Sequence, residues 1–259
     1  MCRIAGIWQT NTRGAPDEIC LTMRDALERG GPDDAGMYLD KTAGLALGHR
    51  RLSVIDLSPA GHQPMSTSDG RYTITYNGEV YNYQELRKTI ESYGFQFRST
   101  SDTEVVLNAF ALWGPECVDN FIGMFAFAVW DAQEKSLFLF RDRIGVKPLF
   151  YYNNTGTFAF SSELKGLHAG LGNELSIDET ALGEFFHYGY ISAPRSIYKN
   201  TYKIEPGCWI KVSSDLMIEK HRYWSYPKAT ERSFLSNNED VLTDQLEEIM
   251  IDAFTKRLI

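Results

Sequence analysis

The sequence predicts a layered α+β domain. Short apolar segments with the composition of strands fill most of the first two-thirds of the chain. Apolar and polar residues alternate only weakly within these segments, which is typical of a sheet covered on both faces. Helical patterns lie between the groups of strands and would supply that cover. At 259 residues the chain is long enough for one large domain, or for one domain with an appendage.

Seven segments are predicted as strands. In one of them Tyr72, Ile74 and Tyr76 alternate with threonines, the period-two pattern of a strand. A final hairpin is predicted from the Glu-Pro-Gly turn at residues 205–207 and the segment 217–224. The seven predicted strands are residues 4–8, 45–52, 72–77, 124–130, 136–140, 148–152 and 157–161.

Three helices are predicted within this part of the chain. The first follows Asn82, which is placed to cap it, and ends at Gly94. Its buried face is expected to carry Leu86, Ile90 and Tyr93. The capping-box spacing Ser-x-x-Glu at residues 101–104 and 176–179 begins two more helices, which end near residues 113 and 188.

The end of the chain has a different composition. Residues 228–240 are polar, as in a linker, and a helix follows with early acidic and late basic residues that match its dipole. The apolar stripe of this helix consists of Leu242, Leu246, Ile249 and Ala253. The prediction is a domain at residues 2–226, followed at 227–259 by a linker and the first helix of another domain.

Composition and charge exclude several classes of protein. The formal charge of −8 and the lack of a basic cluster argue against nucleic-acid binding. The longest apolar runs are too short to cross a membrane, and the amino terminus lacks the pattern of a secretory signal. The four cysteines are far apart, and the histidines lack partners at metal-ligand spacing, so neither a disulfide framework nor a metal site is predicted. We therefore expect a cytoplasmic protein.

Cys2 is the first candidate for chemistry. If Met1 is removed, Cys2 carries both a thiol and a free α-amine. A thiol with a pKa near 8.5 is only slightly ionised at neutral pH and needs a base, and an α-amine with a pKa of roughly 7.7–8.0 suits that task. One residue would then hold the nucleophile and its base. On its own, a cysteine at position two is more simply explained by chance.

Eight segments, the first of which contains Cys2, form a recognisable pattern. In order, they are Cys2-Arg3-Ile4-Ala5-Gly6-Ile7, Gly31-Pro32-Asp33, Gly48-His49-Arg50-Arg51-Leu52-Ser53, Tyr76-Asn77-Gly78-Glu79-Val80-Tyr81-Asn82, Ser101-Asp102-Thr103-Glu104, Gly123-Met124-Phe125-Ala126-Phe127, Arg141-Asp142-Arg143-Ile144-Gly145-Val146-Lys147-Pro148-Leu149 and Ser161-Ser162-Glu163-Leu164-Lys165. Together they resemble the class II glutamine amidotransferase domain, specifically that of glutamine-hydrolysing asparagine synthetase. The resemblance covers residues 2 to about 226.

The resemblance implies the N-terminal nucleophile hydrolase fold, a four-layer α-β-β-α sandwich. It also implies hydrolysis of glutamine to glutamate and ammonia through a γ-glutamyl thioester on Cys2. Asn77 and Gly78 match the donors that stabilise the tetrahedral oxyanion. Asn-Gly after an alternating strand is also a strong hairpin signal, so that alternative stays open here.

The resemblance also implies how glutamine is held. Arg51 matches the residue that grips the α-carboxylate, a task that suits a planar guanidinium, although a surface arginine on a strand is the alternative. Asp102 matches the partner of the substrate ammonium, with Glu79 assisting, although Asp102 is also placed to cap its helix. Arg50 is expected to be structural. Arg141-Asp142, with Gly145 and Lys147-Pro148, is expected to form a turn with an internal ion pair. One departure is Gly30, which stands where the family has arginine. Whether the preceding Arg29 takes the place of that arginine in the loop over the pocket stays open here.

A second domain is expected beyond this chain. The Ser-Gly-Gly-x-Asp-Ser loop of an ATP-using synthetase domain does not occur in these 259 residues. We therefore expect a piece of a longer protein, with no cofactor here and with ATP and Mg²⁺ in that synthetase domain. The expected partners are glutamine, the synthetase domain of the same polypeptide and, as one option, a second copy in a homodimer. The acceptor of ammonia stays open between aspartate and another carboxylate. The alternatives are the glutaminase of a phosphoribosyl- or glucosamine-forming amidotransferase, and a non-catalytic glutamine sensor.

Overall fold

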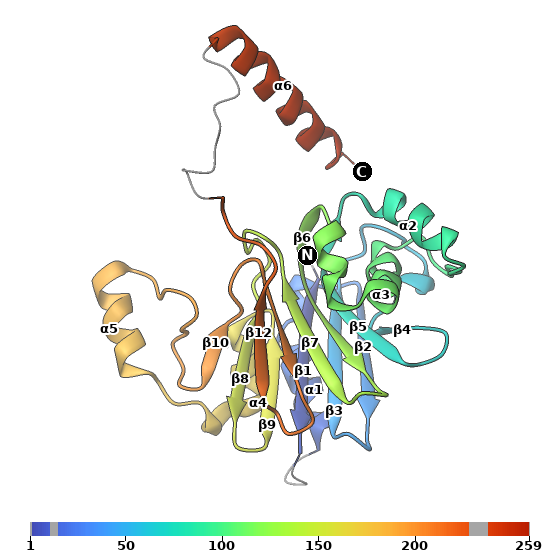
Figure 1. Cartoon of the computed structure of the whole chain (residues 1–259). Coiled ribbons are helices and arrows are strands. Elements are labelled where there is room, and N and C mark those ends of the chain that lie inside the picture. Colours follow the sequence, from blue (N-terminus) through green and yellow to red (C-terminus); the bar gives the residue numbers. More distant parts are fainter. Residues whose placement is uncertain (1, 11–14, 228–237, 259) are drawn as a thin grey trace.

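A computed structural model describes residues 2–10, 15–227 and 238–258 of the chain. Two six-stranded antiparallel sheets stack face to face, and helices cover their outer faces (Figure 1). Among the described residues, no helix is both apolar enough and long enough to pass through a bilayer.

The first sheet has the strand order β10-β8-β9-β1-β3-β2. Its strands are β1 (Arg3–Gln9), β2 (Asp34–Asp40), β3 (Leu45–Arg51), β8 (Phe150–Asn154), β9 (Thr157–Ser161) and β10 (Thr201–Lys203). The second sheet has the order β12-β11-β7-β6-β5-β4. Its strands are β4 (Met65–Ser66), β5 (Tyr72–Val80), β6 (Gly123–Asp131), β7 (Ser136–Arg141), β11 (Cys208–Val212) and β12 (Ile218–Arg222).

Helices form the two outer layers. α1 (Pro16–Asp25) and α4 (Leu164–Leu171) cover the first sheet, and α2 (Tyr83–Ser92) and α3 (Asp102–Trp113) cover the second. Two more helices, α5 (Glu179–Tyr188) and α6 (Glu239–Thr255), lie outside these layers (Figure 1). Four short 3₁₀ helices span Glu28–Gly30, Pro59–Gly61, Gly114–Asn120 and Gly172–Glu174.

Three apolar cores separate the four layers. The middle core lies between the sheets, where the rings of Trp8 and Trp130 meet edge to face at 4.9 Å. One outer core packs α3 and α2 on the second sheet, and the other packs α1 and α4 on the first. Because both faces of each sheet are buried, the strands are apolar on both sides, which explains their weak alternation. The predicted α-β-β-α sandwich is confirmed.

Several local predictions need correction. Asn82 does not cap α2, because its amide bonds instead to the Asn120 carbonyl at 3.0 Å and the Ile122 amide at 2.9 Å. Tyr93 was expected on the buried face but is 63% exposed. The helix at 179–188 is capped by Asp178, which accepts hydrogen bonds from two backbone amides, and not by Ser176.

The predicted linker lies mostly outside the described residues. Residues 228–237 belong to that part, and the final helix is α6, whose bounds include the expected stripe. Leu242, Leu246 and Ile249 of this stripe are exposed. The sequence also left α1, α4 and β2 unpredicted.

Candidate active site

A small cavity of about 100 Å³ lies where the two sheets and α3 meet. Cys2 reaches it from the start of β1, and Arg51 from the end of the neighbouring strand β3. The second sheet contributes residues 76–79 of β5, and α3 contributes its first two residues. The structure thus brings together all six predicted site residues, which are Cys2, Arg51, Asn77, Gly78, Glu79 and Asp102.

Cys2 is half-buried beside the backbone of Leu52. The amide of Leu52 donates to Cys2 Sγ at 3.4 Å, and the thiol faces the Leu52 carbonyl at 3.5 Å. Burial raises the pKa of the Cys2 thiol, and the contact with Leu52 opposes this only in part. Since the thiolate is the nucleophile, the thiol needs a base close to Sγ.

Arg3 fixes the backbone of Cys2 and explains the departure at Gly30. The Arg3 guanidinium donates to the Cys2 carbonyl at 3.0 Å and forms an ion pair with Glu163. A Cβ atom at Gly30 would lie 2.5 Å from Arg3 Cγ, so glycine leaves the space that Arg3 occupies. Arg29 is exposed and has no hydrogen bond or ion pair within the described part of the chain. It therefore does not replace the family arginine at the cavity.

Asn77 and Gly78 lie within β5, where they pair with Ala126 and Phe125 of β6. The hairpin interpretation of this Asn-Gly pair is therefore wrong. Asn77 is 1% exposed, and both polar atoms of its amide lack hydrogen-bond partners among the described residues. A buried unpaired amide is costly. Such a group, lining a cavity, is suited to a ligand that arrives with its own hydrogen-bonding atoms.

Arg51 is a buried residue with 6% of its surface exposed, so the surface-arginine alternative is wrong. Its guanidinium donates to the carbonyls of Ile55 and Ser58, each at 3.3 Å, and to that of Asp56. Arg51 therefore also holds the chain that follows β3 against the cavity. Its neighbour Arg50 forms an ion pair with Asp25 at 2.7 Å, outside the cavity, and this is a structural contact.

Asp102 is a buried carboxylate at the start of α3. It accepts hydrogen bonds from the Tyr76 hydroxyl at 2.7 Å and the Val80 amide at 3.2 Å. Burial raises the pKa of Asp102 to about 6, although both hydrogen bonds favour its charged form. The alternative that Asp102 is the cap of α3 is wrong, because Ser101 caps the helix through the Thr103 amide. A cationic group in the cavity would stabilise the ionised carboxylate.

Sequence reasoning missed the residues that support Asp102. The Tyr76 ring is buried, and its backbone amide donates to Gln63 Oε1 at 2.8 Å. Gln63 Nε2 in turn donates to the Thr103 hydroxyl at 3.0 Å, which ties β5 to α3. Tyr76 and Gln63 both line the cavity. Tyr76 could have been predicted as a site residue, since it directly precedes Asn77 in the strand.

Lys147 was assigned to a turn, yet it also lines the cavity and is only 1% exposed. Burial lowers the pKa of its ammonium group. The turn itself is confirmed, but the expected ion pair between Arg141 and Asp142 is not formed. Asp142 accepts hydrogen bonds from the Val146 and Lys147 amides, each at 2.9 Å, and Arg141 donates to backbone carbonyls.

The described residues contain no group of three or more His, Cys, Asp or Glu side chains placed to hold a metal ion. His49 lies near the site but is fully buried, with Nε2 3.0 Å from the Tyr76 carbonyl oxygen. Burial lowers the pKa of His49 to about 4, so its ring is neutral at physiological pH.

Two stacked antiparallel sheets between helical layers have the architecture of the N-terminal nucleophile hydrolase fold. The sequence profile of the glutamine amidotransferase domain matches residues 1–224. The chain therefore belongs to the glutamine amidotransferase domain family.

Two relatives similar in sequence are named as glutamine-hydrolysing asparagine synthetases. The chain is 38% identical over 240 residues to asparagine synthetase [glutamine-hydrolyzing] 3 of Bacillus subtilis, covering 92% of this chain and 38% of that protein. It is 37% identical over 246 residues to a putative asparagine synthetase [glutamine-hydrolyzing] 2 of Methanocaldococcus jannaschii, covering 88% and 47% respectively. The chain thus spans less than half the length of these relatives.

A solved structure shows the same fold. The glutamine phosphoribosylpyrophosphate amidotransferase of B. subtilis superposes with a TM-score of 0.65 at 18% sequence identity. The match covers 87% of this chain and 50% of the other. At this identity the likeness concerns the fold alone.

Proposed function

We propose that this chain hydrolyses glutamine to glutamate and ammonia. The observation that supports it best is the cavity itself, where a thiol, an unpaired buried amide, a guanidinium and two carboxylates meet. These groups come from four separate segments of the chain. Together they offer a nucleophile, an oxyanion donor and a partner for each charge of an α-amino acid.

The proposed reaction has two halves. After removal of Met1, the α-amine of Cys2 takes the thiol proton, and the thiolate attacks the side-chain amide carbon of glutamine. The Asn77 amide and the Gly78 N–H stabilise the tetrahedral oxyanion, and the α-amine gives its proton to the departing ammonia. Water then attacks the γ-glutamyl thioester, the C–S bond breaks, and glutamate leaves with the thiol restored.

The two charged groups of glutamine share its α-carbon and would be held together, at the other end of the molecule from the reacting amide. Arg51 pairs with the α-carboxylate through its guanidinium. Asp102 pairs with the α-ammonium, and Glu79 assists from the end of β5. The buried position of Asp102 supports this role, because a bound cation would restore the charged form that burial disfavours.

In the whole protein, we propose that the ammonia passes to an ATP- and Mg²⁺-dependent synthetase domain. The similarity to glutamine-hydrolysing asparagine synthetases supports this over a phosphoribosyl- or glucosamine-forming partner. We assign residues 2–226 to the glutaminase domain and residues 227–259 to the linker and first helix of the synthetase domain. The acceptor is aspartate or another carboxylate. A homodimer and a cytoplasmic location stay predictions; the four cysteines are free thiols, which suits a reducing compartment.

Release of glutamate from glutamine by the 259-residue chain tests the proposal. We expect slow turnover by the parent, none by Cys2→Ala, and turnover like the parent's by Cys208→Ala. Cys208 is a matched control, since it is a buried free thiol that does not line the cavity. Mass spectrometry of the active protein should show that Met1 is absent.

Two results would contradict the proposal. Equal glutamate release by the parent and by Cys2→Ala would show that Cys2 is not the nucleophile. Full activity in protein that keeps Met1 would show that the α-amine of Cys2 is not the base. Saturable binding of glutamine without any turnover would instead favour the glutamine-sensor alternative.

A further inference from the structure

A second and larger cavity, of about 620 Å³, lies behind α3. Its walls are the turn between β4 and β5, the segment 93–98 after α2, and one face of α3. On α3 the lining residues have the spacing i, i+3, i+4, i+7 and are Glu104, Leu107, Asn108 and Ala111. Asp102 lies two residues before Glu104, about 200° away around the helix. This space, called here the α3 cavity, is therefore separate from the Cys2 site, and its volume lies within the roughly 300–1,000 Å³ of ligand pockets.

Asn108 places an unpaired amide in the α3 cavity. The residue is 7% exposed and lines the cavity, and its side chain makes no hydrogen bond within the described residues. The polar atoms of this amide are not sealed from solvent like those of Asn77, so they are accessible to a ligand in the cavity. The Asn108 side chain offers both donors and an acceptor. It is suited to a ligand edge that presents a donor beside an acceptor.

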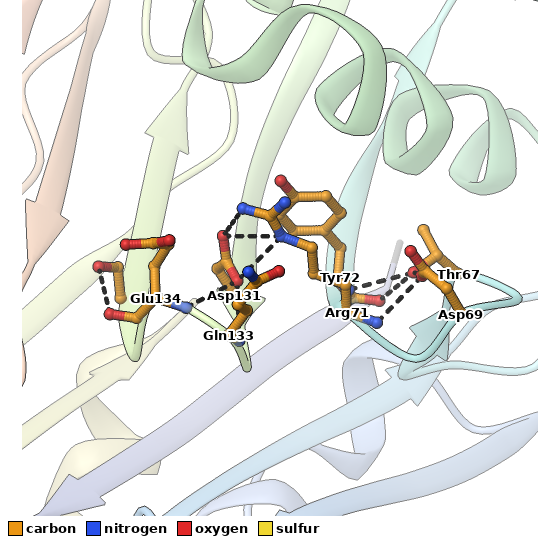
Figure 2. Close-up of polar contacts among 8 residues, drawn as sticks. Thr67, Asp69, Arg71, Tyr72, Asp131, Gln133 and Glu134 are labelled. Atoms are coloured by element: carbon orange, nitrogen blue, oxygen red, sulfur yellow. Dashed lines mark hydrogen bonds and ion pairs between the residues drawn. The ribbon is translucent and has the colours of Figure 1, made fainter.

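Aromatic side chains form the walls around this amide. Tyr72 and Phe95 are half-buried and Tyr93 is exposed, and all three line the cavity. Arg71 lies over the Tyr72 ring with its guanidinium carbon 4.7 Å from the ring centre, and Asp131 holds Arg71 there at 2.9 Å (Figure 2). The Tyr72 ring is thus fixed in place. Walls of this kind favour a planar aromatic ligand.

Among the described residues that line the α3 cavity, Arg98 is the cation best placed to meet a ligand. The carboxylate of Asp69 accepts from the Thr67 hydroxyl and the Arg71 amide, so it is satisfied within its own turn (Figure 2). Glu104 is likewise satisfied, because it accepts from the backbone amides of residues 98 and 99. Arg98 has 62% of its side chain exposed.

The Arg98 guanidinium keeps donors free for a ligand. It donates to the Ser66 carbonyl at 2.6 Å, and its Nε lies 3.6 Å from Glu104. A guanidinium carries five N–H donors, so several remain for a ligand at the mouth of the cavity. A guanidinium also matches the geometry of a phosphate group.

We propose that the α3 cavity is a second binding site, which takes an adenine mononucleotide. Asparagine pairs with the N6 donor and N7 acceptor of adenine, which are the complements of the two functions that Asn108 leaves unpaired. The adenine ring lies among Tyr72, Tyr93 and Phe95, and the phosphate lies at Arg98. The site is independent of the glutaminase reaction, because it shares no lining residue with the Cys2 cavity.

Calorimetric titration of the 259-residue chain with AMP tests this proposal. We expect saturable binding by the parent, and binding weaker by about tenfold or more in Arg98→Gln, since a hydrogen bond to a charged group is lost. Asn108→Leu should weaken binding to a similar extent, and Arg98→Gln keeps the test valid if that core variant folds poorly. Arg195→Gln is the matched control, because Arg195 is half-exposed, pairs with a glutamate at 3.2 Å and lies outside the cavity.

The ligand arms of the same experiment separate the two halves of the nucleotide. Adenosine should bind more weakly than AMP, and inorganic phosphate more weakly still, because each lacks one set of contacts. No saturable binding of AMP at millimolar concentrations would overturn the proposal. So would equal binding by the parent and Arg98→Gln, or phosphate binding as tight as that of AMP, which would indicate an anion site that does not recognise the base.

Discussion

The Tyr76 hydroxyl controls the charge of Asp102, and the variant Tyr76→Phe tests this directly. The hydroxyl donates to the Asp102 carboxylate at 2.7 Å, in a position where burial already raises the pKa of that carboxyl to about 6. A hydrogen bond to a charged group contributes about 1.5–3 kcal/mol, and about 1.4 kcal/mol corresponds to one pKa unit. Removal of the hydroxyl should therefore raise the pKa of Asp102 to about 7–8.

The consequence is a pH-dependent loss of glutaminase activity. Lower pH protonates Asp102, and only its carboxylate attracts the ammonium group of glutamine. At pH 6, about half of Asp102 is ionised in the parent, but only about one tenth to one hundredth in the variant. The kcat/KM of Tyr76→Phe relative to the parent should fall by about 5- to 50-fold at pH 6, and by no more than about 1.3-fold at pH 8.5.

Steady-state glutamate release at matched pH values measures this ratio. Cys2 and its α-amine titrate in both proteins, so their effect on the rate cancels in the ratio. Tyr223→Phe is the control, since the Tyr223 hydroxyl donates to the Arg141 carbonyl at 2.8 Å, away from the cavity. A ratio that stays constant from pH 6 to 8.5, or one equal to that of Tyr223→Phe, would refute the reasoning.

Two further variants test the energetics of the site. Asp102→Asn should raise the free energy of unfolding by up to about 3 kcal/mol at pH 8 and by almost nothing at pH 4. The raised pKa of Asp102 means that the folded protein favours the protonated carboxyl group. The folded parent therefore loses stability as the pH rises through about 6, whereas asparagine does not titrate. Urea unfolding at the two pH values measures this difference, and an equal gain in unfolding free energy at both would exclude titration of Asp102 as the cause. The kcat/KM of the variant should fall at every pH. Gly78→Ala should cost about 1–3 kcal/mol in thermal unfolding, because its Cβ would lie 2.6 Å from the Met124 carbonyl oxygen. The control Gly183→Ala meets nothing within 4 Å and should gain about 0.5–1 kcal/mol, and a Gly78→Ala protein as stable as this control would contradict the steric argument.

Most strands of the two sheets were predictable from the sequence because most of their residues are apolar on both faces, whereas β2, β4 and β10 were not predicted. The helix α4 was not, because two glycines in eight residues disfavour a helix. The structure shows why they are there. A Cβ at Gly166 would lie 2.3 Å from the Ser161 hydroxyl, and one at Gly170 would lie 2.3 Å from Met23 Cγ of α1. Close packing against neighbours that are distant in sequence decides this helix, and a local pattern does not contain that information.

Two helix caps were predicted wrongly from short polar side chains for a similar reason. Asn82 stands at a helix start, where asparagine is favoured as a cap, yet its amide bridges to residues 120 and 122. Ser176 has the capping-box spacing, but Asp178 is the residue that caps α5. Each of these groups has several backbone partners within reach, and the tertiary structure selects among them.

The cavity was predictable in its motif residues but not in its surroundings. Cys2, Asn77 and Asp102 come from motifs with recognisable spacing, and the structure brings them together. Lys147 gave no such indication, because lysine is seldom buried and its sequence neighbours predict a turn. Its position depends on how the turn after β7 packs against the ends of β5 and β6.

The place of β1 within its sheet has a consequence for the nucleophile. Chain ends usually fray, and their backbone amides exchange readily with solvent. Here the strand that begins one residue after Cys2 is paired on both sides, with β3 and with β9. From Ala5 onward both edges of this strand are hydrogen-bonded, so opening it would separate the middle of the sheet. The proposed nucleophile therefore stands next to one of the best protected strands of the fold.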